Sequence, residues 1–245
     1  MTHAARLIVL HTLKYTESSL LVYAYTHLFG RQTYLLRGVR TAKNRSAAAL
    51  FFPLNMIEAE VYHKTGANIQ HIKEYHAKSA LCGIRTNLYK SVIALFLGEL
   101  LYKTIKEEEP NESLFLFLHN AIEELDTISE GISNFHLYFI TRYCAHLGYA
   151  PNINYHPQNT PLFDIPQGSF ISINSTSQLT FSKEESALLY QFHIAPNVSA
   201  TTAIPLNATQ RNLYINAIIR YLSYHLNTPL ALTSPNVLRQ IWESH

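Results

Sequence analysis

The hydrophobic pattern changes its period once along the chain, near residue 80, and this change limits the folds that are possible. Before it, apolar residues tend to alternate with other residues, as from Leu7 to Leu13. After it, apolar residues recur every three or four positions, as from Tyr89 to Ile105. Alternation is typical of half-buried strands, and three-and-four spacing is typical of amphipathic helices. The sequence therefore predicts a β-rich domain over residues 1–80 and a mainly helical domain over residues 81–245.

The first domain contains five strand-like runs joined by short connections. Gly30 supplies a turn before the third run, and Pro53 stops a short helical segment before the fourth. The five runs are residues 7–13, 20–24, 31–39, 54–63 and 68–78. Five short strands are too few for a sandwich, and they fit a five-stranded barrel of the OB-fold type.

The second domain is predicted to be a set of capped helices with one irregular insertion. The N-cap residues that the pattern indicates are Asn111, Ser133, Ser182 and Asn207. Between about residues 151 and 180 the periodicity fails and prolines accumulate, which predicts an irregular excursion. The predicted fold class is α+β, with an N-terminal OB-fold barrel, a helical domain and an irregular insertion that has no cysteine.

The composition indicates a globular cytoplasmic protein. Apolar residues make up 47% of the chain and charged residues only 15%. The two cysteines, Cys82 and Cys144, form no disulfide framework, which fits a reducing compartment. No apolar run approaches the roughly 18–20 residues that a membrane span needs. We therefore expect a cytoplasmic location and no membrane partner.

Positive charge is concentrated in the first domain. Residues 1–80 carry ten Lys and Arg against four Asp and Glu, a net charge of +6, whereas the remainder has nine against thirteen, a net charge of −4. Residues 31–45 alone hold five cations and no acid. A basic segment of this kind, joined to an acidic remainder, indicates a module that binds a polyanion.

The basic segment is the candidate binding site. OB-folds bind single-stranded nucleic acid in a groove that needs cations for phosphates and flat rings for bases. Tyr23, Tyr25 and Tyr62 are further candidates for stacking. Because no base-reading motif is found, binding should be dominated by phosphates and depend strongly on salt. The residues assigned to this site are Arg31, Tyr34, Arg37, Arg40, Lys43 and Arg45.

Motifs for catalysis or metal binding are not found. The thirteen histidines are scattered, and none forms an H-E-x-x-H motif. A nucleophile elbow, a phosphate loop and a dinucleotide fingerprint are all missing. We predict a protein without catalytic activity, cofactor or metal.

Several short motifs stand out in the first 151 residues. They are Tyr15-x-Glu17, Gly30 after Thr26, Arg37-Gly38-Val39-Arg40 followed by Lys43 and Ser46, Leu50-x-x-Pro53, and Leu147-Gly148-Tyr149-Ala150-Pro151. Together they resemble the bacterial RecO family of recombination mediators. The resemblance implies an OB-fold domain, a helical domain and an irregular insertion. It also implies binding and annealing of single-stranded DNA in recombinational repair, with RecR and single-stranded-DNA-binding protein as partners, RecA as an indirect one, and a bacterial, nucleoid-associated location.

The insertion departs from the pattern of the family. In many relatives the motif at residues 147–151 opens a zinc-binding insertion with four cysteines. In this chain residues 152–173 contain no cysteine. His156 alone cannot hold zinc in a four-ligand site, so a structural zinc ion is not expected.

Two other functions are compatible with the residues themselves. An OB-fold with a basic loop can bind RNA as well as DNA, and the two can be separated by competition. The chain can also be an interaction scaffold in which the acidic helical domain is the main functional part and the barrel binds a peptide, and in that case no salt-dependent affinity for nucleic acid is expected.

Overall fold

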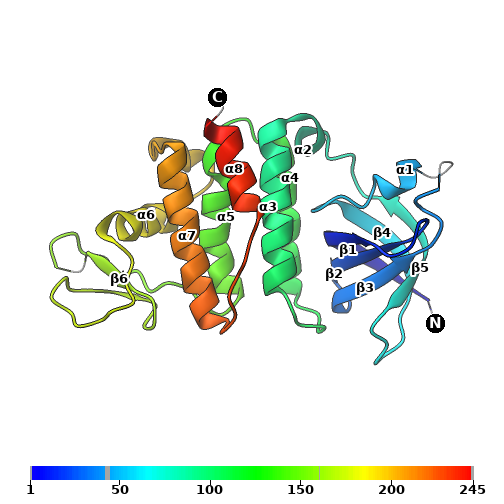
Figure 1. Ribbon diagram of the computed structural model, residues 1–245, viewed down its shortest axis with the longest axis horizontal. Coiled ribbons are helices and arrows are strands. Elements are labelled where there is room, and N and C mark those ends of the chain that lie inside the picture. The colour runs from blue at the N-terminus through cyan, green and yellow to red at the C-terminus, as the bar shows by residue number, and fades with distance from the viewer. Residues whose placement is uncertain (1, 42–44, 160, 244–245) are drawn as a thin grey trace. The chain divides into compact units, whose positions relative to one another are not determined.

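The computed structural model describes residues 2–41, 45–159 and 161–243, and the side chains of Arg45 and Ser46 are not among the parts described. The chain divides into two compact units, Met1–Thr127 and Ile128–His245, coloured blue to green and green to red in Figure 1. The domain boundary predicted near residue 80 falls inside the first unit, between the barrel and the helices that follow it. Among the described residues, no helix combines the length and apolar character needed to cross a bilayer.

The first unit begins with a closed five-stranded barrel. The strands follow the order β1-β2-β3-β5-β4, and the β3–β5 pair is parallel whereas the other pairs are antiparallel. A short helix, α1 (Arg45–Ala48), precedes β4. The strands are β1 (Thr2–Lys14), β2 (Leu20–Thr26), β3 (Gly30–Leu36), β4 (Met56–Tyr62) and β5 (Gln70–Ala77). This arrangement confirms the predicted OB-fold barrel.

Alternation along the strands builds the barrel core. Leu7, Val22 and Val61 point inward and are buried together with residues of β3. The third strand ends at Leu36 and not at Val39 as predicted, because the chain turns at Gly38, whose φ is +71°. Glycine adopts this left-handed conformation without the steric cost that other residues meet.

Three helices complete the first unit: α2 (Cys82–Thr86), α3 (Leu88–Thr104) and α4 (Glu112–Thr127). Asn111 caps α4 as predicted, because its side chain accepts a hydrogen bond of 3.0 Å from the Leu114 backbone. Helix α3 lies against β1, where a Cβ at Gly98 would collide with Pro53. Leu10 points away from the barrel core and is nevertheless buried. The outer face of β1 is therefore covered by the unit's own helix.

The second unit is helical with one small hairpin. Ser182 and Asn207 each form a capping box, which confirms these two predicted N-caps. The predicted cap Ser133 is wrong, because the helix already begins at Ile132. The elements are α5 (Ile132–His146), β6 (Leu162–Asp164), β7 (Ser169–Ile171), α6 (Lys183–Ile194), the 3₁₀ helix η2 (Ser199–Ala203), α7 (Ala208–His225) and α8 (Ser234–Glu243).

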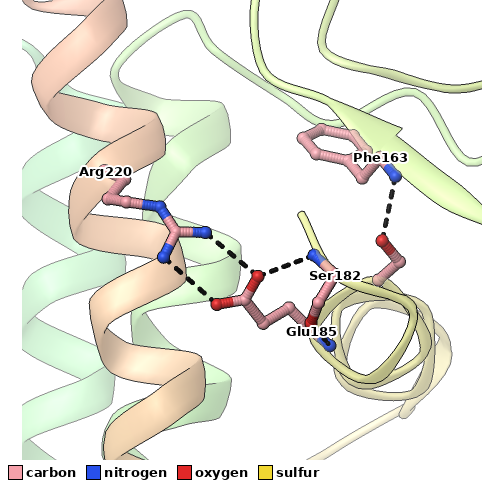
Figure 2. A network of polar contacts seen from close by, with 5 residues as sticks. Phe163, Ser182, Glu185 and Arg220 are labelled. Carbon is pink, nitrogen blue, oxygen red and sulfur yellow. Dashed lines mark hydrogen bonds and ion pairs between the residues drawn. The ribbon is translucent and has the colours of Figure 1, made fainter. Parts of the chain in front are cut away.

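A polar network ties three elements of the second unit together (Figure 2). The Glu185 carboxylate accepts two hydrogen bonds from Arg220 on α7, of 3.2 and 3.0 Å, and one of 2.8 Å from the Ser182 backbone. The Ser186 hydroxyl accepts a hydrogen bond of 2.9 Å from the Phe163 backbone on β6. The beginning of α6 is thus attached both to α7 and to the hairpin.

The irregular insertion is packed around aromatic rings. The Phe163 ring centroid lies 5.1 Å from that of Phe170 and 5.4 Å from that of Tyr221. The Asn154 side chain exchanges two hydrogen bonds with the Phe170 backbone, of 3.0 and 2.7 Å. Within the described ranges, no three His, Cys, Asp or Glu side chains gather where they could hold a metal ion. Since residues 152–173 also lack cysteine, they do not fit a four-ligand zinc site.

Candidate nucleic-acid interface

The predicted basic segment, residues 31–45, does not form one continuous surface in the structure. Arg31 is the first residue that is used elsewhere. Its guanidinium donates hydrogen bonds to the carbonyl oxygens of Tyr102, at 3.0 Å, and of Ile105. The same group lies 4.8 Å from the centre of the Tyr102 ring and 5.8 Å from that of Tyr23. These carbonyls end α3 and carry the negative end of its dipole. Arg31 therefore joins the barrel to α3, and we leave it out of the interface.

Tyr34 does not fit the stacking role predicted for it. Its side chain is 0% exposed and belongs to the barrel core. Burial also raises the pKa of its phenol well above the ordinary value. Tyr25 is buried as well, and Tyr23 packs against Tyr102 with ring centroids 4.9 Å apart. Of the tyrosines considered from the sequence, only Tyr62 is strongly exposed, at 48%.

Arg40 holds two loops together. Its guanidinium donates to the carbonyl oxygens of Thr16, at 3.0 Å, and of Glu17, at 3.2 Å. Its backbone N–H donates to the Ser18 carbonyl at 3.1 Å. The basic loop after β3 is therefore attached to the turn between β1 and β2, and the half-buried Arg40 positions that turn.

Among the predicted cations whose side chains the structure describes, Arg37 is the most open to solvent. Its side chain is exposed, and among the described residues it makes no hydrogen bond or ion pair. Lys43 and the Arg45 side chain lie outside the described residues, so their assignment to the site stays a prediction. The tertiary structure thus separates the predicted residues into Arg37, which is available, Arg40, which positions a turn, and Arg31 and Tyr34, which are packed inside the unit.

The end of the first hairpin adds residues that the sequence reasoning did not assign. Leu13 is 49% exposed and Tyr15 is 56% exposed, with the exposed Lys14 between them. The strand register pairs Leu21 of β2 with Leu13 of β1 and with Leu35 of β3, so these three leucines lie side by side across the sheet. The signal that could have found this surface is the Tyr15-x-Glu17 motif next to a strand end. We call Leu13, Lys14, Tyr15, Arg37 and Arg40 the hairpin-end surface.

The charge of the hairpin-end surface differs from that of the outward face of β4. The three cations of the hairpin-end surface outnumber the single acid of the turn, Glu17. On β4, by contrast, Glu58 and Glu60 face outward, the first 3.0 Å from His76 and the second 2.8 Å from Lys73. On this face Glu60 already neutralises Lys73, so a polyanion would be attracted more strongly to the hairpin end. OB-folds commonly bind oligonucleotides with the loop between their first two strands.

Comparison with known proteins identifies the family of the chain. The family model described as Recombination protein O N terminal matches residues 1–80, and the one described as Recombination protein O C terminal matches residues 85–233. The chain is 34% identical over 238 residues to the DNA repair protein RecO of Bacteroides fragilis, covering 96% of this chain and 97% of that protein.

Two further relatives carry the same name. The RecO protein of Flavobacterium psychrophilum is 31% identical, with 96% of this chain and 97% of that protein covered. The RecO protein of Azobacteroides pseudotrichonymphae is 27% identical, with 99% and 100% covered. Both matches include the barrel and the helices. With an OB-fold barrel, two family models that together span most of its length and relatives matched nearly end to end, the chain belongs to the RecO family of DNA repair proteins.

Proposed function

We propose that this protein binds single-stranded DNA through the hairpin-end surface and promotes annealing of complementary strands during recombinational repair. The observation that carries the proposal is the pair of exposed cations, Lys14 at the end of β1 and Arg37 just after β3, next to the two loops that Arg40 holds together. Membership of a DNA repair family supports DNA as the ligand.

The chemistry of annealing needs charge neutralisation and not base reading. Two single strands repel each other through their phosphates, and bound cations lower this repulsion, so that complementary bases can meet. Lys14 and Arg37 each present a flexible, exposed charge at the barrel end. Such contacts favour any sequence equally.

The partners implied by the family are part of the same proposal. We propose that the protein acts with RecR and with single-stranded-DNA-binding protein, so that RecA can load on the exposed strand. The second unit, Ile128–His245, is the part we assign to partner binding, because the proposed DNA surface lies in the first unit.

The test compares two arginines that differ in position. Arg37→Ala and Arg239→Ala each remove one exposed positive charge, and Arg239 lies on α8, 3.8 Å from Glu243. Binding of single-stranded DNA is measured between about 50 and 200 mM salt, and each lost phosphate contact lowers the slope of log K against log salt by about 0.7. We expect the slope to fall by about 0.7 for Arg37→Ala and by about 1.4 for Arg37→Ala combined with Lys14→Ala. The slope should not change for Arg239→Ala.

Annealing of two complementary oligonucleotides, followed with and without single-stranded-DNA-binding protein, supplies the functional measurement. The wild-type protein should accelerate annealing most at low salt, and Arg37→Ala should reduce the rate. If the wild-type protein shows no salt-dependent affinity for single strands, the proposal is overturned in favour of an interaction scaffold. If a matched RNA competes better than DNA, the ligand is RNA.

A further inference from the structure

We infer that Tyr15 stacks on a base of the bound strand and makes the hairpin-end surface selective for single-stranded over duplex nucleic acid. The inference rests on the proposed function and deepens it, because phosphate contacts alone do not separate the two forms. It replaces the stacking role that the sequence assigned to Tyr34.

Exposure and position at the basic end of the barrel together single out Tyr15 among the tyrosines of the first unit. It is 56% exposed, whereas Tyr34 and Tyr25 are buried in the first unit. Leu13, two residues earlier on the same outer face, extends the exposed apolar area. An aromatic ring left in water at the end of a barrel has no packing role to explain it, and a base offers the flat apolar partner that it lacks.

The backbone that carries Tyr15 is held in place. The Tyr15 N–H donates to the Ser19 carbonyl at 3.1 Å, and the Ser19 N–H donates to the Thr16 hydroxyl at 3.1 Å. Arg40 binds the carbonyl oxygens of the same turn from the opposite loop. Since the turn is already ordered before binding, little conformational entropy is lost when a base stacks on it.

Two cations lie near Tyr15 along the same end of the barrel. Lys14 on β1 and Leu36 on β3 both pair with Leu20, so they lie on either side of β2. Neighbouring β-strands are about 4.7–4.9 Å apart, so these two backbones are separated by about 10 Å. Arg37 follows Leu36 directly, and Tyr15 follows Lys14. The Tyr15 backbone therefore lies next to the backbone of one cation and about two strand widths from that of a second.

Selectivity follows from the geometry of the ligand. In a duplex each base is stacked between its neighbours, so its face is not available to a side chain. In a single strand the faces can be exposed, and an aromatic side chain binds them regardless of sequence. Tyr15 should therefore contribute to single-strand affinity alone, whereas Lys14 and Arg37 contribute to both forms.

The experiment uses the full-length chain, a thymidine oligonucleotide and a duplex of equal length. Tyr15→Ala should weaken single-strand binding roughly 5- to 150-fold, the range expected for one stacked base. Its salt slope and its duplex affinity should equal those of the wild type. Tyr15→Phe retains the ring and should bind as the wild type does. Tyr62→Ala is the matched control, since Tyr62 is 48% exposed but lies at the end of β4, on the outward face that carries Glu58 and Glu60.

A spectroscopic measurement tests the stacking directly. The chain has a single tryptophan, Trp242, so Tyr15→Trp combined with Trp242→Phe places the only indole at the proposed contact. Its fluorescence should be quenched by single strands and left unchanged by the duplex. The inference is overturned if Tyr15→Ala binds single strands as tightly as the wild type, or loses single strands and duplex equally. Failure of the proposed function is distinguishable, because then wild-type binding itself shows no salt dependence.

Discussion

Replacing Arg31 should destabilise the first unit without changing the salt dependence of DNA binding. The guanidinium donates to two carbonyls at the end of α3 and lies 4.8 Å from the Tyr102 ring. Hydrogen bonds from a charged group contribute about 1.5–3 kcal/mol each, and the helix dipole and the ring about 0.5–1 kcal/mol each. Since these terms share one half-buried side chain and do not add fully, we expect Arg31→Ala to cost about 2–4 kcal/mol.

Hydrogen exchange is the suitable assay, because it reports the opening of each segment separately. Peptides that cover the end of α3 and the start of β3 should exchange roughly 25- to 700-fold faster in Arg31→Ala, the equivalent of about 2–4 kcal/mol. Arg37→Ala, six residues along the chain, serves as the control and should exchange as the wild type does. The reasoning is refuted if Arg31→Ala keeps native protection while it lowers the salt slope as Arg37→Ala does.

Two further predictions concern the second unit, where Trp242 fluorescence in urea reports unfolding. Glu185→Ala removes the partner of Arg220 and the capping box, and should lower the free energy of unfolding by about 1–3 kcal/mol, whereas Glu243→Ala, which breaks an exposed pair, should cost less than about 1 kcal/mol. An equal loss would contradict the role given to the network. Burial, with a smaller effect from Arg211, lowers the pKa of His136 to about 3. Between about pH 6.5 and 3 the unfolded chain therefore binds a proton that the folded chain does not, so stability falls as pH falls, and His136→Gln should remove up to about 1.4 kcal/mol per pH unit of that slope. An unchanged slope would show that His136 is not the responsible group.

Local patterns were enough to predict the fold class. The alternation in residues 1–80 predicted a five-stranded barrel, and the caps Asn111, Ser182 and Asn207 predicted where helices begin. These features depend on neighbours a few residues away, so they can be read from the chain. One failure is also local in origin. Ser133 is compatible with a cap, but Gly131 in the left-handed conformation already precedes the helix.

The choice of face in the third strand could not be read from the sequence. Gln32, Tyr34 and Leu36 lie on one face, and Arg31, Thr33 and Leu35 on the other, so each face contains one leucine. The two faces are too similar in apolar character for the sequence to show which one points into the barrel. Closure of the barrel turns Tyr34 inward, and this removes it from any ligand.

The sequence by itself determined that a basic segment covers the third strand of a barrel and the loop after it, because charge and period are properties of consecutive residues. Only the tertiary structure decided which cations are available. Arg31 and Arg37 are the same residue type six positions apart, and the sequence does not separate them. The partners of Arg31 come from α3, more than seventy residues later, and nothing in the described part of the chain reaches Arg37. The physical reason is that a cation cannot bind a ligand when its hydrogen bonds are already made to carbonyl oxygens of the protein. Long-range packing alone determines where those oxygens lie.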